Sequence, residues 1–154
     1  NKLVPEALAR GGIAELRGYD TVRREVAYGL GSRVDLLPSG PGRPICYLEI
    51  KNVHLKRGDW AEFPDCVTER GAKHMAELAD MARAGHRAVV LYVVQRGDCR
   101  AFRVAGDLDP AYNRAFEAAR AAGVEALCYA CAVSETGIDI ARSLPLHRWT
   151  DGET

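Results

Sequence analysis

The sequence carries no net charge, because 21 Lys and Arg residues balance 21 Asp and Glu residues over 154 positions. A basic footprint over the whole domain is therefore absent, and any site for a polyanion must be a local patch. No apolar run approaches the ~20 residues that span a bilayer, and no secretory leader is recognisable. We therefore expect a cytoplasmic protein without a membrane segment.

Paired cysteine motifs are also scarce. The five cysteines are odd in number and scattered through a chain long enough to form a core, which favours free thiols in a reducing compartment. Cys128 and Cys131 have CxxC spacing, but they lie in an apolar, strand-like run where positions three apart face opposite ways. Because no second pair exists, we expect two buried structural cysteines rather than a zinc or redox site.

The composition is sufficient for one globular domain with a hydrophobic core. Apolar residues make up 47% and charged residues 27% of the chain, which is typical of globular proteins. We assign residues 1–154 to a single domain. The chain begins at Asn1 rather than at Met, so we expect a trimmed terminus or an excised fragment.

Hydrophobic periodicity predicts an α/β fold with a mixed sheet and helices on both faces. We expect helices at 4–13, 66–84 and 110–122, with a further turn or two at 14–19. We expect strands at 21–28, 32–38, 45–54, 86–95 and 124–133, and a short last strand near 138–140. The polar segment 55–66 is expected to be a connection. The run at 88–94 is apolar on both faces, which indicates a central parallel strand.

An acidic residue and a Glu-x-Lys pair lie on consecutive predicted strands. In an antiparallel pair, directly opposed residues share a face. If the connecting turn is centred on Pro41, Asp35 opposes Tyr47, so Glu49 and Lys51 lie on the Asp35 face. Two carboxylates and a lysine on one face are what a metal-dependent phosphodiesterase needs. Lys51 would orient the attacking water or neutralise charge in the transition state. The alternative is a charged, solvated face of a sheet.

A third carboxylate joins this face if the preceding turn is centred on Leu30, because Glu25 then opposes Asp35. Mg²⁺ prefers oxygen ligands and usually takes only one or two carboxylates. Asp35 and Glu49 are expected to hold the ion, with the carbonyl of Ile50 as a further ligand. Glu25 would bind directly, through water, or at a second ion.

Phosphate contacts are predicted from the start of the helix after residue 66. Arg70 and His74 are four positions apart and share a helix face, and helix N-termini favour anions. We expect Arg70, Lys73 and His74, together with Arg33 of the second strand, to contact phosphates; the alternative is a capped surface helix. Gly71 inside this helix costs about 1 kcal/mol relative to Ala, which hints at a close approach of backbone or ligand.

Several of these segments together resemble the sugar fermentation stimulation protein A (SfsA) family. The similar segments are Glu15–Tyr19, Arg24–Gly29, Ser32–Asp35, Glu49–Val53, Phe63–His74 and Ser143–Pro145. They cover nearly the whole chain in order.

The resemblance implies a prokaryotic cytoplasmic protein with a PD-(D/E)xK restriction-endonuclease-like αβββαβ core. It also implies DNA binding, a link to sugar (maltose) metabolism, and an OB-like barrel that precedes this domain and is missing here. The carried-over nuclease site is Asp35, Glu49 and Lys51. Glu25, by strand geometry, or Glu15, by analogy with nucleases that use a glutamate of the first helix, would supply the additional carboxylate; we prefer Glu25.

Two functions follow as expectations. The first is a DNA-binding nuclease that depends on Mg²⁺ or Mn²⁺. The second is a catalytically silent DNA-binding regulator of sugar (maltose) metabolism genes. A protein-interaction module remains a third class, and oligomer formation stays open.

Overall fold

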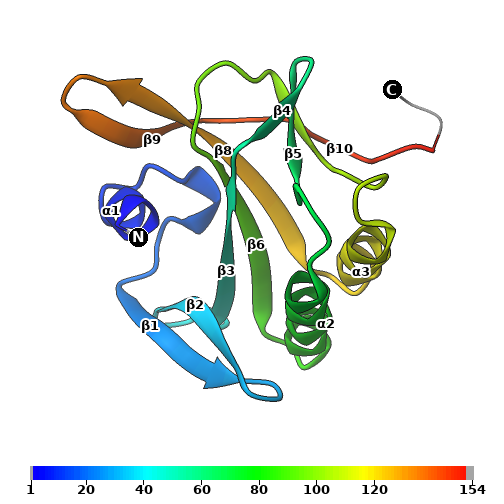
Figure 1. The fold of residues 1–154 in the computed structure, drawn as a ribbon. Coiled ribbons are helices and arrows are strands. Elements are labelled where there is room, and N and C mark those ends of the chain that lie inside the picture. Colours follow the sequence, from blue (N-terminus) through cyan, green and yellow to red (C-terminus); the bar gives the residue numbers. More distant parts are fainter. Residues whose placement is uncertain (1, 152–154) are drawn as a thin grey trace.

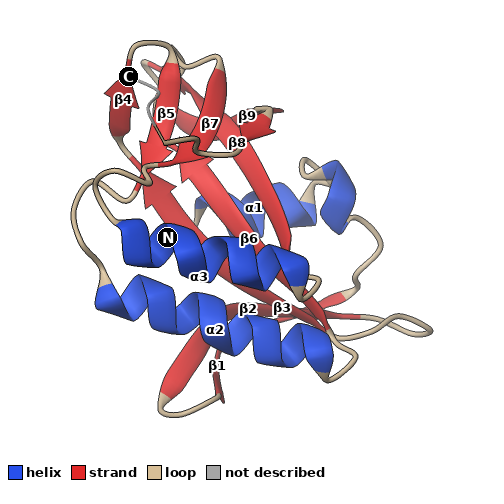
Figure 2. Ribbon diagram, turned by 90° about the vertical axis from the view of Figure 1, so that its right-hand side faces the viewer, coloured by secondary structure: helices blue, strands red, loops and turns tan. Residues whose placement is uncertain are grey.

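A six-stranded mixed sheet lies between α1 on one face and α2 and α3 on the other (Figures 1 and 2). The structure is a computed structural model that describes residues 2–151. In spatial order, the strands are β1 (Thr21–Tyr28), β2 (Ser32–Ser39), β3 (Cys46–Val53), β6 (Arg87–Val94), β8 (Glu125–Ser134) and β9 (Gly137–Ser143). The helices are α1 (Leu3–Ala9), the short 3-10 helix η1 (Ala14–Leu16), α2 (Glu69–Arg83) and α3 (Pro110–Ala121). The predicted α/β class and the helices on both faces are confirmed.

The centre of the sheet is parallel and buried on both sides. β6 pairs in parallel with β3 and with β8. Its alternate residues enter two separate cores: Val90 and Tyr92 pack towards α2 and α3, and Val89 and Leu91 pack towards α1. This two-sided burial explains why the strand is apolar at nearly every position.

A second, four-stranded sheet was not predicted. It contains β10 (Leu146–His147), β7 (Ala101–Val104), β5 (Trp60–Phe63) and β4 (Leu55–Arg57), in that spatial order. The prediction of 55–66 as a polar connection was therefore wrong. Strands of two to four residues are too short to show alternation, and the parallel pairing of β5 with β7 joins segments that are distant in sequence.

The starts of α2 and α3 are capped and tied together. The Thr68 hydroxyl accepts a hydrogen bond from the Gly71 N–H at 3.0 Å, so α2 begins later than predicted, at Glu69. One Asp109 oxygen accepts from the Tyr112 N–H at 3.0 Å, and the other accepts from the Thr68 N–H at 2.8 Å. A Cβ at Gly71 would lie 2.7 Å from a Thr68 carbon and 3.2 Å from the Tyr112 ring. The close approach at Gly71 is therefore helix packing.

The cysteines are arranged as predicted. All five are free, and Cys128 and Cys131 are buried in the cores on opposite faces of the sheet. Within residues 2–151, none of the helices combines the length and the apolar character needed to cross a membrane.

Candidate active site

Two carboxylates meet where β2 runs beside β3. The two strands are antiparallel, and the bridge between Leu36 and Leu48 places their neighbours Asp35 and Glu49 beside each other. The predicted register, with Asp35 opposite Tyr47, was wrong by two residues. Because side chains alternate between the two faces of a strand, a shift of two residues leaves Asp35 and Glu49 on the same face of the sheet, so the acid pair still forms.

Glu49 is the buried centre of the cluster, with only 3% of its surface exposed. Its Oε1 lies 3.3 Å from the Lys51 Nζ and 3.1 Å from the His74 Nδ1. The Lys51 Nζ and the His74 Nδ1 are themselves 3.0 Å apart. The Glu49 Oε2 is buried and has no hydrogen-bond partner among the described residues. A buried carboxylate oxygen left in this state is costly unless a cation or donor fills the place.

Asp35 lies at the edge of the same cluster and is half-buried. Its Oδ2 accepts a hydrogen bond from the Ile50 N–H at 2.7 Å, which fixes the carboxylate against β3. Burial raises the pKa of the Asp35 carboxyl, and the Glu49 carboxylate raises it further. The Ile50 N–H, Lys51 and His74 oppose that rise without cancelling it.

This donor set fits a hard divalent cation. Asp35 and Glu49 offer adjacent carboxylate oxygens, one of which is buried and unpartnered. Within residues 2–151, no group of three or more His, Cys, Asp or Glu side chains is arranged to hold a metal ion. Two adjacent carboxylates are the number that a small hard cation usually takes, with water and phosphate completing its shell.

Glu25 and Glu15, the two candidates for an additional carboxylate, lie in different surroundings. The β1–β2 register is the predicted one, but the pairing skips Glu25, whose φ of 50° is in the left-handed region. Glu25 and Asp35 line one cavity of about 390 Å³. The Glu15 carboxylate instead accepts a hydrogen bond from the Tyr129 hydroxyl at 2.6 Å. The geometry favours Glu25.

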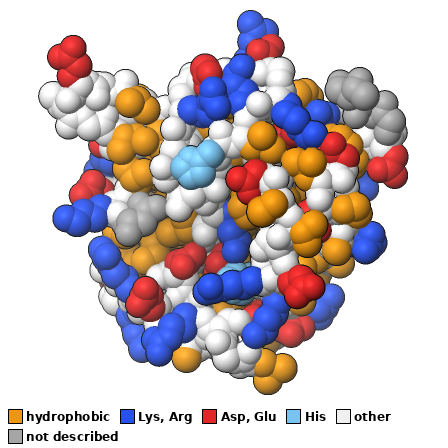
Figure 3. Space-filling view, viewed as in Figure 1, with side chains coloured by type: hydrophobic (Ala, Val, Ile, Leu, Met, Phe, Trp, Pro, Cys, Tyr) orange, Lys and Arg blue, Asp and Glu red, His pale blue; other side chains and the backbone are white. Residues whose placement is uncertain are grey.

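The four predicted phosphate-binding residues line a common cavity of about 280 Å³: Arg33, Arg70, Lys73 and His74. The first three are exposed, whereas His74 is buried and reaches the acid pair. His74 thus joins the basic cavity to Glu49. Figure 3 shows Lys and Arg side chains around the lower part of this face, with acidic side chains and a His between them.

Glu77 supports this arrangement and was not singled out in the sequence. It is buried and accepts hydrogen bonds from the Leu30 N–H, at 2.9 Å, and from the Ser32 hydroxyl. The Lys73 Nζ donates to the Leu30 carbonyl at 2.7 Å. A Cβ at Gly29 would lie 1.9 Å from the Glu77 Oε2, so the turn needs glycine there. α2 therefore holds the β1–β2 turn in place. The available signal was its position three residues after His74, on the same side of α2.

Tyr28 is the last residue of β1. Its hydroxyl is buried and has no hydrogen-bond partner within the described chain. Burial raises the pKa of Tyr28, and the negative charge of Glu49 is the next largest cause. A second unpartnered polar atom therefore lies in the electrostatic environment of the acid pair.

Comparison with known proteins identifies the family. The sugar fermentation stimulation protein RE domain, SfsA, matches residues 1–137. The chain belongs to the SfsA family. A sugar fermentation stimulation protein homolog of Paramagnetospirillum magneticum is 58% identical over 95% of this chain. The corresponding homolog of Dinoroseobacter shibae is 60% identical, also over 95% of this chain.

The fold also matches a solved SfsA structure. The structure of Pyrococcus furiosus SfsA in complex with Ca²⁺ has a TM-score of 0.84 and 28% identity over 92% of this chain. The chain spans 61% of that protein, 62% of the Paramagnetospirillum homolog and 60% of the Dinoroseobacter homolog. It therefore corresponds to about three fifths of these SfsA proteins.

We predict that Asp35→Asn makes this SfsA-family chain more stable near neutral pH. A folded-state pKa raised above the unfolded value contributes stability below the unfolded pKa of about 3.9. That contribution is lost as pH rises through the raised pKa, so the ionised Asp35 carboxylate is unfavourable at neutral pH. Thermal melts should show a higher Tm for Asp35→Asn at neutral pH and no difference at low pH.

Asp98→Asn is the control, and we expect it to change Tm in the opposite direction. The hydrogen bond from Arg96 holds the pKa of the exposed Asp98 carboxyl at about 2. Asp98→Asn should therefore lower the Tm slightly at neutral pH. An Asp35→Asn variant that melts below the parent at neutral pH contradicts the charge repulsion described here.

Proposed function

We propose that this domain is a cytoplasmic DNA-binding nuclease that hydrolyses phosphodiester bonds with Mg²⁺ or Mn²⁺. One observation carries the proposal: the buried Glu49 has an unpartnered oxygen beside Asp35, with Lys51 and His74 within hydrogen-bond distance. A surface ion pair would not need a carboxylate oxygen buried without a partner.

Asp35 and Glu49 are the residues that would hold the ion, with the Ile50 carbonyl and Glu25 as further donors. When bound, the ion would supply Lewis-acid activation of the scissile phosphate and of the attacking water. The Ca²⁺ complex of Pyrococcus furiosus SfsA supports a divalent-cation site, because Ca²⁺ and Mg²⁺ share a preference for oxygen ligands.

Lys51 would act on the reacting phosphate. Its ammonium group is held between Glu49 and His74, at 3.3 Å and 3.0 Å, and is only partly exposed. A fixed cation in a site with little water stabilises negative charge that develops in the transition state. His74 contacts both Glu49 and Lys51, so it positions the ammonium group relative to the carboxylate.

Three exposed cations would bind the DNA backbone. Arg33, Arg70 and Lys73 line the cavity that ends at His74. This local patch can bind phosphates although the net charge is zero. The same cations would also serve a catalytically silent DNA-binding regulator of sugar metabolism genes, which differs from the nuclease in lacking turnover.

Cleavage assays separate the two functions. Labelled single-stranded, duplex and branched DNA would be incubated with the protein in Mn²⁺ or in EDTA. We expect cleavage in Mn²⁺ only, and none by Asp35→Ala. Salt-dependent binding without cleavage would identify the regulator. Cleavage that persists in Asp35→Ala would remove the acid pair from the mechanism.

A further inference from the structure

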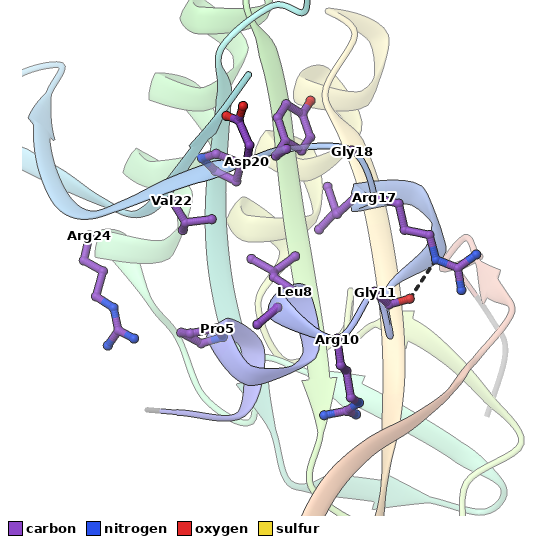
Figure 4. A pocket seen from close by; sticks show the side chains of 13 residues that line it. Pro5, Leu8, Arg10, Gly11, Arg17, Gly18, Asp20, Val22 and Arg24 are labelled. Carbon is purple, nitrogen blue, oxygen red and sulfur yellow. Dashed lines mark hydrogen bonds between the residues drawn. The ribbon is translucent and has the colours of Figure 1, made fainter. Parts of the chain in front are cut away.

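A second large cavity lies on the α1 side of the β1–β2 hairpin, with a volume of about 720 Å³ (Figure 4). We call it the arginine groove, and define it by an apolar floor and a basic rim: Pro5, Leu8 and Val22 below, and Arg10, Arg17 and Arg24 around them. Its volume is within the ~300–1,000 Å³ typical of ligand sites. None of these six residues was assigned a function above.

The rim retains free hydrogen-bonding capacity. Arg10 donates to the Ile140 carbonyl at 2.6 Å, and the Arg17 Nε donates to the Gly11 carbonyl at 2.7 Å. These bonds anchor two guanidinium groups and leave their remaining N–H groups available. The Arg24 side chain is exposed and forms no hydrogen bond or ion pair within residues 2–151. The groove therefore presents three cations, together with the Asp20 carboxylate, around its apolar surface.

The arginine groove adjoins the cavity that contains Asp35 of the acid pair. Pro5 and Arg24 line both the arginine groove and the cavity of about 390 Å³ that contains Glu25 and Asp35. A chain of phosphates at the acid pair would therefore extend past Arg24 into the groove.

We propose that the arginine groove binds unpaired nucleotides next to the scissile phosphate, so that the substrate class is single-stranded or locally unpaired nucleic acid. This inference rests on the proposed function. In a duplex, the faces of the bases are stacked, and only phosphates and base edges are accessible. Arginine side chains without an apolar floor would be sufficient to bind the phosphates of a duplex. An apolar floor gains a partner only when a base is unstacked and lies on it.

Binding without metal tests the groove separately from catalysis. Fluorescence anisotropy in EDTA would compare a short oligothymidylate with a blunt hairpin duplex. Val22 is 38% exposed in the floor, so Val22→Asp removes apolar surface and adds a repelling charge. We expect Val22→Asp to weaken single-strand binding about tenfold or more, because a base loses apolar contact and meets a repelling charge, and to weaken duplex binding less than about twofold.

Val133→Asp is the matched control. Val133 is 66% exposed in β8, away from the groove, so it reports the effect of the added charge alone. If Val22→Asp fails to fold, Arg24→Ala replaces it, because the Arg24 side chain is exposed and its loss should not disturb the fold. Arg24→Ala should reduce the salt slope of single-strand binding by about 0.7, as expected for one lost phosphate contact.

The outcomes distinguish this inference from the proposed function. If neither Val22→Asp nor Arg24→Ala weakens single-strand binding, the groove does not bind nucleotides. This result is also expected if another protein segment covers the groove, and it overturns the groove assignment. Equal losses for single strand and duplex also overturn it. In both cases, Asp35-dependent cleavage could still be intact. A protein that binds neither form of DNA contradicts the proposed DNA binding, and the inference fails with it.

Discussion

Lys51→Ala is expected to slow Mn²⁺-dependent cleavage about 10²–10³-fold, the loss typical for removal of one fixed group that stabilises transition-state charge. The same change should leave Mn²⁺ affinity unchanged or increase it. The Lys51 ammonium lies 3.3 Å from the Glu49 Oε1, where it competes with a cation for the carboxylate. Calorimetric Mn²⁺ titration and single-turnover cleavage would measure the two effects separately.

Two further variants make this result specific. Lys56→Ala, on β4 and outside the cluster, should cleave at the parent rate. Lys51→Arg should not restore activity, because the planar guanidinium replaces a compact ammonium in a side-chain position only 13% exposed. A Lys51→Ala variant that loses Mn²⁺ binding, or that cleaves at the parent rate, contradicts the role assigned to Lys51.

Of the variants described here, Glu62→Ala should lower the free energy of unfolding most. Glu62 is 1% exposed and Arg103 is 4% exposed, and the Arg103 Nε donates to the Glu62 Oε2 at 2.6 Å. Arg57 donates to the other Glu62 oxygen. Removing one partner of a buried ion pair costs about 3–5 kcal/mol, because the buried Arg103 charge loses its carboxylate partner. We expect Tm to fall by roughly 6–20 °C, measured by calorimetry.

An exposed ion pair provides the comparison. Glu117 accepts from Arg148, whose side chain is 78% exposed, at 3.4 Å. Glu117→Ala should change the free energy of unfolding by less than about 1 kcal/mol. Similar Tm changes for Glu62→Ala and Glu117→Ala would show that the second sheet does not depend on its buried pair.

The acid pair could be predicted because strand pairing preserves parity. The turn centred on Leu30 gave the correct β1–β2 register, and an error of two residues at the next turn kept Asp35 and Glu49 on one face. The central strand β6 was equally predictable, because burial on both faces leaves an uninterrupted apolar run.

Other features depend on contacts between distant segments. Glu77 binds the β1–β2 turn across 45 or more residues of sequence, and no local pattern marks its partner. His74 shares a helix face with Arg70, yet tertiary packing buries it beside Glu49. Four short strands form the second sheet through pairings that have no periodic signal.

A Mn²⁺ soak of crystals of this protein tests the central claim most directly. Anomalous diffraction should show a Mn²⁺ peak bound by the Asp35 and Glu49 carboxylates, and Asp35→Ala crystals should lose it. Absence of a peak at the acid pair in millimolar Mn²⁺, or a peak that persists in Asp35→Ala, would contradict the metal site on which the proposed nuclease rests.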